Sequence, residues 1–224
     1  MWRLDHTFAN HWADFVGISA SNPLAKALAE ASTAIELSPD DRLVLDRDPA
    51  GPVFLLIAGV LKVVKQSQNG HEIWLADFQA PAIVGELSAL LGSPRTSDVI
   101  ADSEVVVLSV PRIVFSEAAK TDANLAHALN IELARRVRDT SERLAELYSV
   151  SVMGRLHFEL VRLGVQDVAD DEVYRIIDSI NVSDIAARIH ATRESTSRAL
   201  SRLKQIGIVQ TENAGMKIIA PRLE

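Results

Sequence analysis

Two oppositely charged side chains, Glu86 and Arg95, stand nine residues apart in the stretch G-E-L-S-A-L-L-G-S-P-R-T-S-D-V-I-A, residues 85–101. Gly85 permits a tight backbone, and the residues after it favour one helical turn that ends near Gly92. Free N–H groups at the start of such a turn can hold an anion. The Arg95 guanidinium adds a permanent positive charge, so phosphate is the expected ligand.

The Glu86 carboxylate would not bind a phosphate by itself, because both are hydrogen-bond acceptors. It can accept a hydrogen bond from a hydroxyl of a sugar that carries the phosphate. The stretch therefore predicts a site for a sugar phosphate. A buried structural ion pair between Glu86 and Arg95 is the alternative.

A second candidate site lies in N-V-S-D-I-A-A-R-I-H-A-T-R-E-S-T-S-R-A-L-S-R-L-K-Q-I-G-I-V, residues 181–209. Asn181 or Ser183 can cap a first helix, and a turn near residues 190–192 leads to a second one. The core side of the second helix is predicted to hold Leu200, Leu203 and Ile206. Its outer side is predicted to hold Arg193, Glu194, Ser197 and Arg198.

Such an outer face can read DNA bases, because Arg can donate two hydrogen bonds to O6 and N7 of guanine and Glu can accept one from N4 of cytosine. Residues 188–204 carry five basic side chains against Glu194, a local charge of +4 within a chain of net charge −7. The pattern indicates a helix-turn-helix whose second helix enters the major groove. A solvated face with an Arg–Glu pair within the helix is the alternative.

The elements that position the first site are short β-rich runs between residues 35 and 110, punctuated by turn residues such as Gln68-Asn69-Gly70. They predict an antiparallel sandwich or jelly roll that the one-turn helix interrupts.

From about Thr121 the hydrophobic period becomes helical, and the run to Met153 contains neither Pro nor Gly. Heptad spacing places Leu133, Thr140 and Leu147 on one seam position and Asn130, Val137 and Leu144 on the other. A two-stranded coiled coil between identical chains follows, with a helix packed on the roll as the alternative. Residues 149–151 are the expected hinge, with Ser151 capping the next helix, and the last strands form a hairpin that turns at residues 213–215.

Composition narrows the function classes. The chain lacks Cys, which excludes disulfides and iron–sulfur ligation, and its six His residues show no metal-ligand spacing. We expect no metal site, no catalytic residues and no enzyme activity, because neither a ligand cluster nor a nucleophile–base pair can be identified. No apolar run reaches the roughly 20 residues of a membrane span, so a cytoplasmic protein without membrane contact is expected.

Residues 85–101 resemble the phosphate-binding cassette of cyclic-nucleotide-binding domains, and A-R-R-V-R-D-T-S-E-R-L and T-R-E-S-T-S-R resemble the dimer helix and recognition helix of Crp/Fnr transcription regulators. The resemblance covers about residues 35–220. It implies that Glu86 binds the ribose 2′-hydroxyl, that Arg95 and Thr96 bind the cyclic phosphate, and that Thr140 and Ser141 contact the base. The implied ligand-binding set is Gly85, Glu86, Leu87, Arg95, Thr96, Thr140 and Ser141.

The same resemblance implies that Arg193, Glu194 and Arg198 read bases while Thr192 and Ser195 contact phosphates. The departures are Asp139, where an apolar residue is usual, and His190, where Gly is usual in the turn. His tolerates a positive φ, so the turn is expected to survive with some strain.

The sequence therefore predicts an α+β protein: a cyclic-nucleotide-binding β-roll (1–120), a dimerisation helix and hinge (121–150) and a winged helix-turn-helix (151–224). The resemblance implies a homodimeric regulator that binds cAMP or cGMP, a palindromic TGTGA-type site on double-stranded DNA, and RNA polymerase. Thr96 resembles the residue found in cGMP-selective sites, whereas the Thr140-Ser141 pair resembles the base contact of cAMP sites. Of the two ligands we favour cAMP. The alternative is a regulator of the same architecture that senses another ligand, such as cyclic di-GMP, or needs none.

Overall fold

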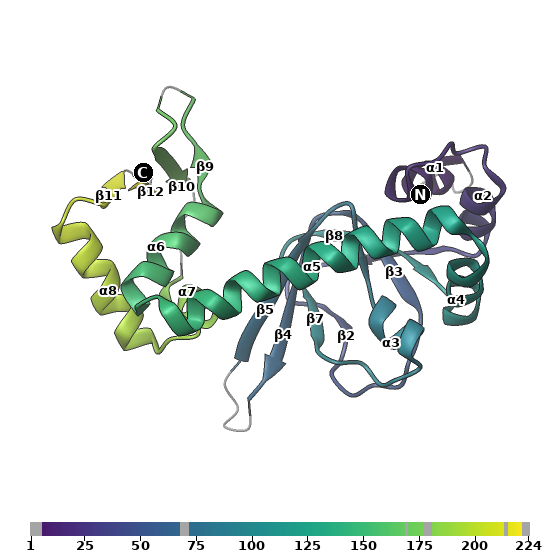
Figure 1. The fold of residues 1–224 in the computed structure, drawn as a ribbon, viewed down its shortest axis with the longest axis horizontal. Coiled ribbons are helices and arrows are strands. Elements are labelled where there is room, and N and C mark those ends of the chain that lie inside the picture. The colour runs from purple at the N-terminus through teal and green to yellow at the C-terminus, as the bar shows by residue number, and fades with distance from the viewer. Residues whose placement is uncertain (1–5, 68–71, 169, 177–180, 213–214, 221–224) are drawn as a thin grey trace. The chain divides into compact units, whose positions relative to one another are not determined.

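A computed structural model describes residues 6–67, 72–168, 170–176, 181–212 and 215–220 (Figure 1). The chain divides into two compact units, Met1–Val137 and Arg138–Glu224. The predicted fold class is confirmed, since the first unit holds an antiparallel β-roll and the second a winged helix-turn-helix. The three-part division into residues 1–120, 121–150 and 151–224 stays a prediction.

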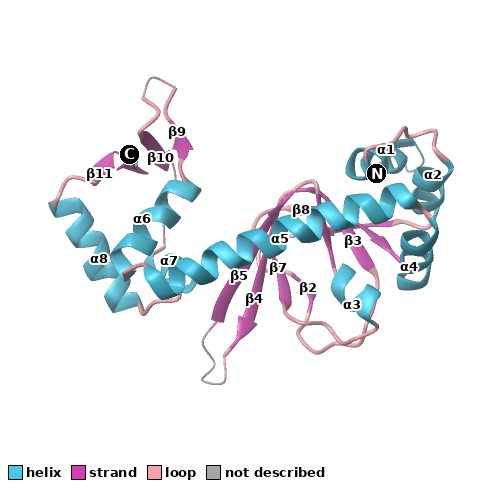
Figure 2. Cartoon of the chain, viewed as in Figure 1, coloured by secondary structure: helices cyan, strands magenta, loops and turns pink. Residues whose placement is uncertain are grey.

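The roll consists of two four-stranded antiparallel sheets (Figure 2). The first has the order β1 (Thr33–Leu37), β8 (Val105–Val110), β3 (Val53–Ala58) and β6 (Ala82–Val84). The second has the order β2 (Arg42–Val44), β7 (Asp98–Ala101), β4 (Val60–Gln66) and β5 (Glu72–Gln79). The turn predicted at residues 68–70 lies outside the described residues.

The position of strand β3 between two cores explains why its sequence is a continuous apolar run and does not alternate between apolar and polar residues. Successive side chains of a strand point to opposite faces, and here both faces are covered. Phe54 and Leu56 belong to the core that also holds residues of the second sheet, whereas Val53 and Leu55 belong to a core shared with helices. The first sheet is therefore the middle layer of this unit.

Helices cover the outer face of that sheet: α1 (His6–Val16), α2 (Pro23–Glu30), α4 (Arg112–Thr121) and the start of α5 (Ala123–Ser149). Trp12 of α1 is fully buried, and its ring lies 6.4 Å from that of Phe115 on α4. Asn22 caps α2 by accepting a hydrogen bond from the Leu24 amide at 2.9 Å. Helices α1 and α2 thus contribute side chains from residues 8–29 to the core of this unit.

The helical region begins earlier than residue 121, where the sequence placed it, because α4 already starts at Arg112. The break between α4 and α5 falls at Asp122, whose carboxylate accepts from the amides of Asn124 and Leu125 at 2.9 and 3.1 Å. A side chain that caps the next helix in this way ends one helix and starts another without Pro or Gly. Hydrophobic period alone does not detect such a break.

The second unit packs three helices on a small sheet: α6 (Val152–Leu163), α7 (Val182–Arg188) and α8 (Arg193–Gln205). The sheet has the order β11 (Val209–Glu212), β12 (Gly215–Ile219), β10 (Val173–Ile176) and β9 (Val165–Gln166). Ser151 caps α6 as predicted, accepting from the Gly154 amide at 3.3 Å. Of the predicted turn at 213–215, residues 213 and 214 lie outside the described residues. No described helix is both long enough and apolar enough to span a membrane.

Candidate functional site

The one-turn helix predicted after Gly85 is α3 (Glu86–Leu91), which interrupts the roll between β6 and β7. Gly85 has φ 85°, a left-handed conformation that a side chain disfavours. A Cβ there would also overlap Nη1 of Arg95 and lie 3.2 Å from the Pro52 carbonyl oxygen. Glycine at position 85 is therefore required both by the backbone and by the close approach of Arg95.

Arg95 lies inside this turn and is 7% exposed. Its Nη1 donates to the Gly85 carbonyl at 3.0 Å and to Ser88 Oγ at 2.7 Å, and its Nη2 donates to the Pro52 carbonyl at 2.6 Å. Among the described residues, no carboxylate forms an ion pair with it. Burial lowers the pKa of Arg95, and the more distant charges of Asp48 and Glu86 oppose that shift.

Glu86, the first residue of α3, is 2% exposed and is held by an arginine that the sequence did not single out. Arg136 of α5 donates from Nη1 to Glu86 Oε1 at 2.7 Å and from Nη2 to the Ile83 carbonyl at 2.5 Å. Its guanidinium lies 4.1 Å from the centre of the Phe78 ring, and Glu132 accepts from its Nε at 2.9 Å. Glu86 and Arg136 form a buried ion pair within the first unit.

The alternative of a Glu86–Arg95 ion pair is therefore wrong in its partner, since Glu86 pairs with Arg136 and Arg95 bonds to backbone carbonyls and Ser88. Burial raises the pKa of Glu86, and the charge of Arg136 lowers it again in part. The sequence holds one weak signal for Arg136, its position four residues before Thr140, because residues at that spacing share a helix face.

The remaining predicted ligand contacts are on the surface. Leu87 on α3 and Thr96 after Arg95 are exposed, and the Thr96 carbonyl accepts from Lys65 Nζ at 2.9 Å. Thr140 and Ser141 are exposed on α5 and belong to the second unit. Their contact with the ligand stays a prediction. Among the described residues, no group of three His, Asp or Glu side chains could hold a metal ion.

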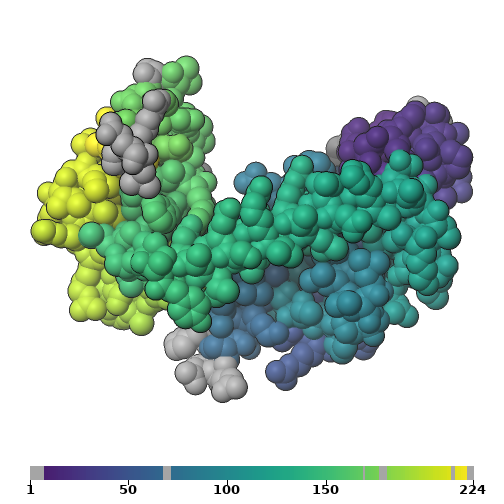
Figure 3. Space-filling model, in the orientation of Figure 1, coloured from purple at the N-terminus to yellow at the C-terminus, as the bar shows by residue number. Residues whose placement is uncertain are grey.

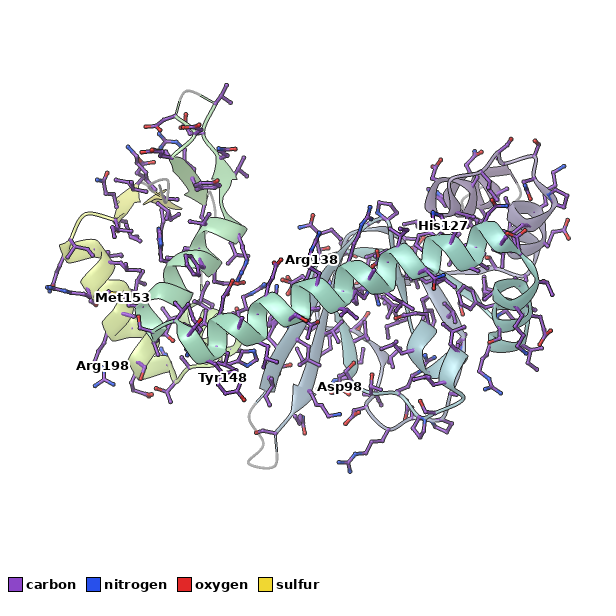
Figure 4. The ribbon with its side chains drawn as sticks, viewed as in Figure 1. Asp98, His127, Arg138, Tyr148, Met153 and Arg198 are labelled. Carbon is purple, nitrogen blue, oxygen red and sulfur yellow. The ribbon has the colours of Figure 1, made fainter. Side chains whose placement is uncertain are left out.

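Helix α8 presents the second predicted site. Thr192 caps it, with Oγ1 accepting from the Ser195 amide at 3.2 Å and donating to Ser195 Oγ at 3.0 Å. Arg193, Glu194 and Arg198 are exposed, and Arg198 projects from α8 (Figure 4). Within the described part of the chain, Glu194 forms no ion pair with either arginine. Of the alternative, the Arg–Glu pair within the helix is therefore not formed, and the contact of these side chains with DNA stays a prediction.

The opposite side of α8 is buried at Thr196, Ala199 and Leu203. Ile206, predicted to lie in this core, is instead 46% exposed, because the helix ends at Gln205 and Ile206 is its C-cap. Asn181, rather than Ser183, caps α7 by accepting from the Ser183 amide at 2.9 Å. These details leave the predicted outer face of α8 unchanged.

The turn between α7 and α8 holds His190 at φ 51°, the positive value expected at a position where glycine is usual. Burial lowers the pKa of the His190 imidazole, and the positive charges of Arg155 and Arg143 lower it further. The turn therefore carries both backbone strain and a base that resists protonation.

The two units match two known domain families. Residues 34–122 match the cyclic nucleotide-binding domain, and residues 154–224 match the Crp-like helix-turn-helix domain. These two domains define a DNA-binding transcription regulator with a cyclic nucleotide-binding domain.

Relatives agree with this class. The chain is 24% identical over 193 residues to the CRP-like cAMP-activated global transcriptional regulator of Mycobacterium tuberculosis, covering 86% of each protein. It is 22% identical over 181 residues to the CRP-like protein Clp of Xanthomonas campestris pv. campestris, covering 78% of this chain and 79% of Clp. The solved structure of the c-di-GMP responsive regulator CLP of Xanthomonas campestris superposes with a TM-score of 0.75 at 16% identity, covering 89% and 99% of the two chains. The chain belongs to the Crp/Fnr family of transcription regulators.

Proposed function

We propose that this regulator binds a cyclic purine nucleotide, preferably cAMP, at Glu86 and Arg95, and that the ligand controls the binding of a homodimer to a palindromic TGTGA-type DNA site. The proposal rests on the burial of Arg95 without a carboxylate partner. Charged side chains are almost never fully buried unless they are paired. A bound phosphate would supply the missing negative charge.

The backbone around Arg95 allows the guanidinium to approach closely. Gly51 and Gly85 lie against the guanidinium, and a Cβ at Gly51 would come within 3.0 Å of Nη2. The three hydrogen bonds to Gly85, Ser88 and Pro52 fix the plane of the guanidinium. Such pre-organisation reduces the entropy that is lost when an anion binds.

Glu86 is suited to accept from a ribose hydroxyl because Arg136 fixes its orientation and keeps a positive charge beside it. A carboxylate held by a guanidinium still has lone pairs for a second donor. Thr140 and Ser141 would contact the base, with their hydroxyl oxygens accepting hydrogen bonds from the amino group of adenine. This is why cAMP is favoured over cGMP, for which the hydroxyl of Thr96 is the competing argument.

The dimer is proposed from the exposed apolar side chains of α5. Val137 is 66% exposed and Leu144 53%, and both occupy the seam position predicted from the heptads. Residues of α5 form much of the visible surface in Figure 3, and Tyr148 projects from the same helix in Figure 4. Pairing two such helices would bury this seam, and Thr140 would face the partner chain.

On DNA, α8 would enter the major groove with its N-terminal end toward the bases. Arg193, Glu194 and Arg198 would contact base edges, while the capped start of the helix at Thr192 and Ser195 would meet a phosphate. RNA polymerase is the further partner that we propose for a regulator of this kind.

One observation favours a regulator that senses another ligand, such as cyclic di-GMP, or needs none. In the structure, Glu86 already has an ionic partner and Arg95 already has three acceptors. A relative of known structure is described as responsive to c-di-GMP. Direct titration separates these alternatives.

Calorimetric titration with cAMP, cGMP and cyclic di-GMP tests the pocket, and band shifts on a TGTGA palindrome test the output. We expect cAMP to bind and to strengthen the DNA complex, and Arg95→Leu to abolish both effects. Arg112→Leu, on α4, is the control for loss of an arginine from the same unit. Equal cAMP binding by the Arg95→Leu variant and the unaltered protein would contradict the proposed ligand site.

A further inference from the structure

A buried carboxylate lies in the second unit, on a different helix from the face of α8 that we propose to read DNA. Glu159 on α6 is 3% exposed. Its Oε1 lies 3.4 Å from Nη1 of Arg188 at the end of α7, and its Oε2 lies 3.4 Å from Nη1 of Arg162 on α6. One oxygen of this carboxylate therefore faces an arginine of its own helix, and the other faces an arginine of α7.

The charges continue to a third helix. Nη2 of Arg162 donates to Oε1 of Glu146, near the end of α5. Burial lowers the pKa of Arg162, but its hydrogen bond with Glu146 and the charges of Glu146 and Glu159 outweigh burial and raise it. Four side chains of alternating charge thus join α5, α6 and α7, and we call Glu146, Arg162, Glu159 and Arg188 the three-helix network.

A second tie joins the same helices through backbone oxygens. Arg155 on α6 donates from Nε to the Ile189 carbonyl at 3.0 Å, and from Nη1 to the Leu147 and Val150 carbonyls at 3.3 and 2.9 Å. Ile189 is the C-cap of α7. Together with the three-helix network, these bonds hold the end of α7 to the end of α5 from two sides.

The three-helix network ends next to the helix-turn-helix. Arg188 is the last residue of α7, and Arg193 begins the helix that reads DNA. Only the short turn at residues 189–192 separates them. The orientation of α7 relative to the end of α5 therefore sets the direction in which α8 leaves the turn.

We propose that Glu159 is a positioning residue for DNA recognition, which acts through Arg188 to hold the helix-turn-helix in a fixed orientation on the end of α5. Replacing a buried ion pair by apolar residues of similar size often costs no stability, and the best-attested use of such pairs is to set one geometry among several. The network therefore defines orientation rather than adding to the total stability. The inference rests on the DNA-binding function of α8.

The first test measures orientation without DNA. The chain contains no cysteine, so Tyr148→Cys on α5 and Ser201→Cys on α8 would carry the only two spin labels of each chain. Labelled protein is diluted with unlabelled protein so that distances within one chain dominate. We expect Glu159→Met combined with Arg188→Leu to keep the thermal midpoint but to broaden or shift the label-to-label distance. Asp167→Asn, which removes a carboxylate partner of Arg175 outside the three-helix network, is the control and should leave the distance unchanged.

The second test measures DNA binding by the same variants. The apolar pair should weaken binding to the TGTGA palindrome on the order of tenfold while non-specific DNA binding stays constant. Arg188→Lys alone, which keeps a cation opposite Glu159 and leaves Arg162 unchanged, should lose much less affinity than the apolar pair. An unchanged label distance in a folded apolar variant would overturn the positioning role. Failure of the unaltered protein to bind the palindrome would instead count against the proposed DNA site and leave the distance test valid.

Discussion

The proposed ligand site of the roll and the outer face of α8 use the same residue types, arginine and glutamate, in opposite surroundings. Glu86 is 2% exposed and bound to Arg136 of a distant helix, whereas Glu194 is exposed on the same helix as Arg198. Buried charges depend on their partners, because an unpaired one costs several kcal/mol, while exposed charges are solvated by water. Substitutions in the pocket should therefore act together, and those on α8 should act separately.

The strongest test of this contrast is Arg136→Leu. It leaves the Glu86 carboxylate buried without its cation, and breaking such a pair should lower the free energy of unfolding by about 3 kcal/mol. Chemical denaturation of the variant measures the loss. Arg135→Leu, on the exposed side of the same helix, should change stability by no more than about 0.5 kcal/mol. Equal stability of the two variants would show that the pocket charges are not coupled.

A second test compares two left-handed glycines of the same cassette. Gly85→Ala should cost about 2 kcal/mol and abolish nucleotide binding, since the methyl group overlaps Arg95 in addition to the strain at φ 85°. Gly92→Ala has φ 64° but only the end of Arg112 nearby, at 3.9 Å, so strain alone, about 1 kcal/mol, should remain. Unfolding curves and calorimetric titration separate the two effects. A Gly85→Ala variant that binds as well as Gly92→Ala would contradict the close approach of Arg95.

Substitutions on the outer face of α8 should change the affinity for DNA and leave the stability of the protein unchanged. Arg198→Ala should weaken binding to the TGTGA site by about 1–3 kcal/mol, the usual value of one base contact, with an unchanged thermal midpoint. Arg202→Ala, exposed one turn further along α8, is the matched control and should cost less. Fluorescence anisotropy with labelled operator provides the measurement. If both variants lose the same affinity at every sequence, Arg198 acts as a general positive charge and not as a base reader.

The smallest expected effect is that of His190→Gly. The pKa of His190 is lowered in the folded protein, so below pH 6.5 the unfolded chain binds more protons and the second unit loses stability as the pH falls. Glycine removes this pH dependence, and the relief of the positive φ should add up to about 1 kcal/mol at pH 7. Thermal unfolding between pH 5 and pH 8 measures both effects. His190→Asn, which keeps a side chain at this φ but does not titrate, should remove the pH dependence without the added stability.

How far the sequence could predict each site follows from the same contrast. The outer face of α8 depends on one helix, so its period was enough to place Arg193, Glu194 and Arg198 together. The pocket joins segments that are far apart in the chain, and the Pro52 carbonyl that holds Arg95 carries no signal in its residue type. Arg136 was missed because three nearly adjacent arginines, at 135, 136 and 138, cannot be ranked until the helix is packed. The exposure of Ile206 was missed for a similar reason, because the helical period does not show that the helix ends one residue before it.

The middle layer of the roll has a practical consequence for anyone who would use this unit as a portable sensor. The domain match begins at residue 34, yet Val53 and Leu55 of β3 are buried against a core to which Trp12 and Leu28 also belong. A gene fragment cut at that match would expose a broad apolar surface, and such surfaces drive aggregation. A biosensor or fusion protein built from this roll should therefore retain the first two helices as a fixed part of its design.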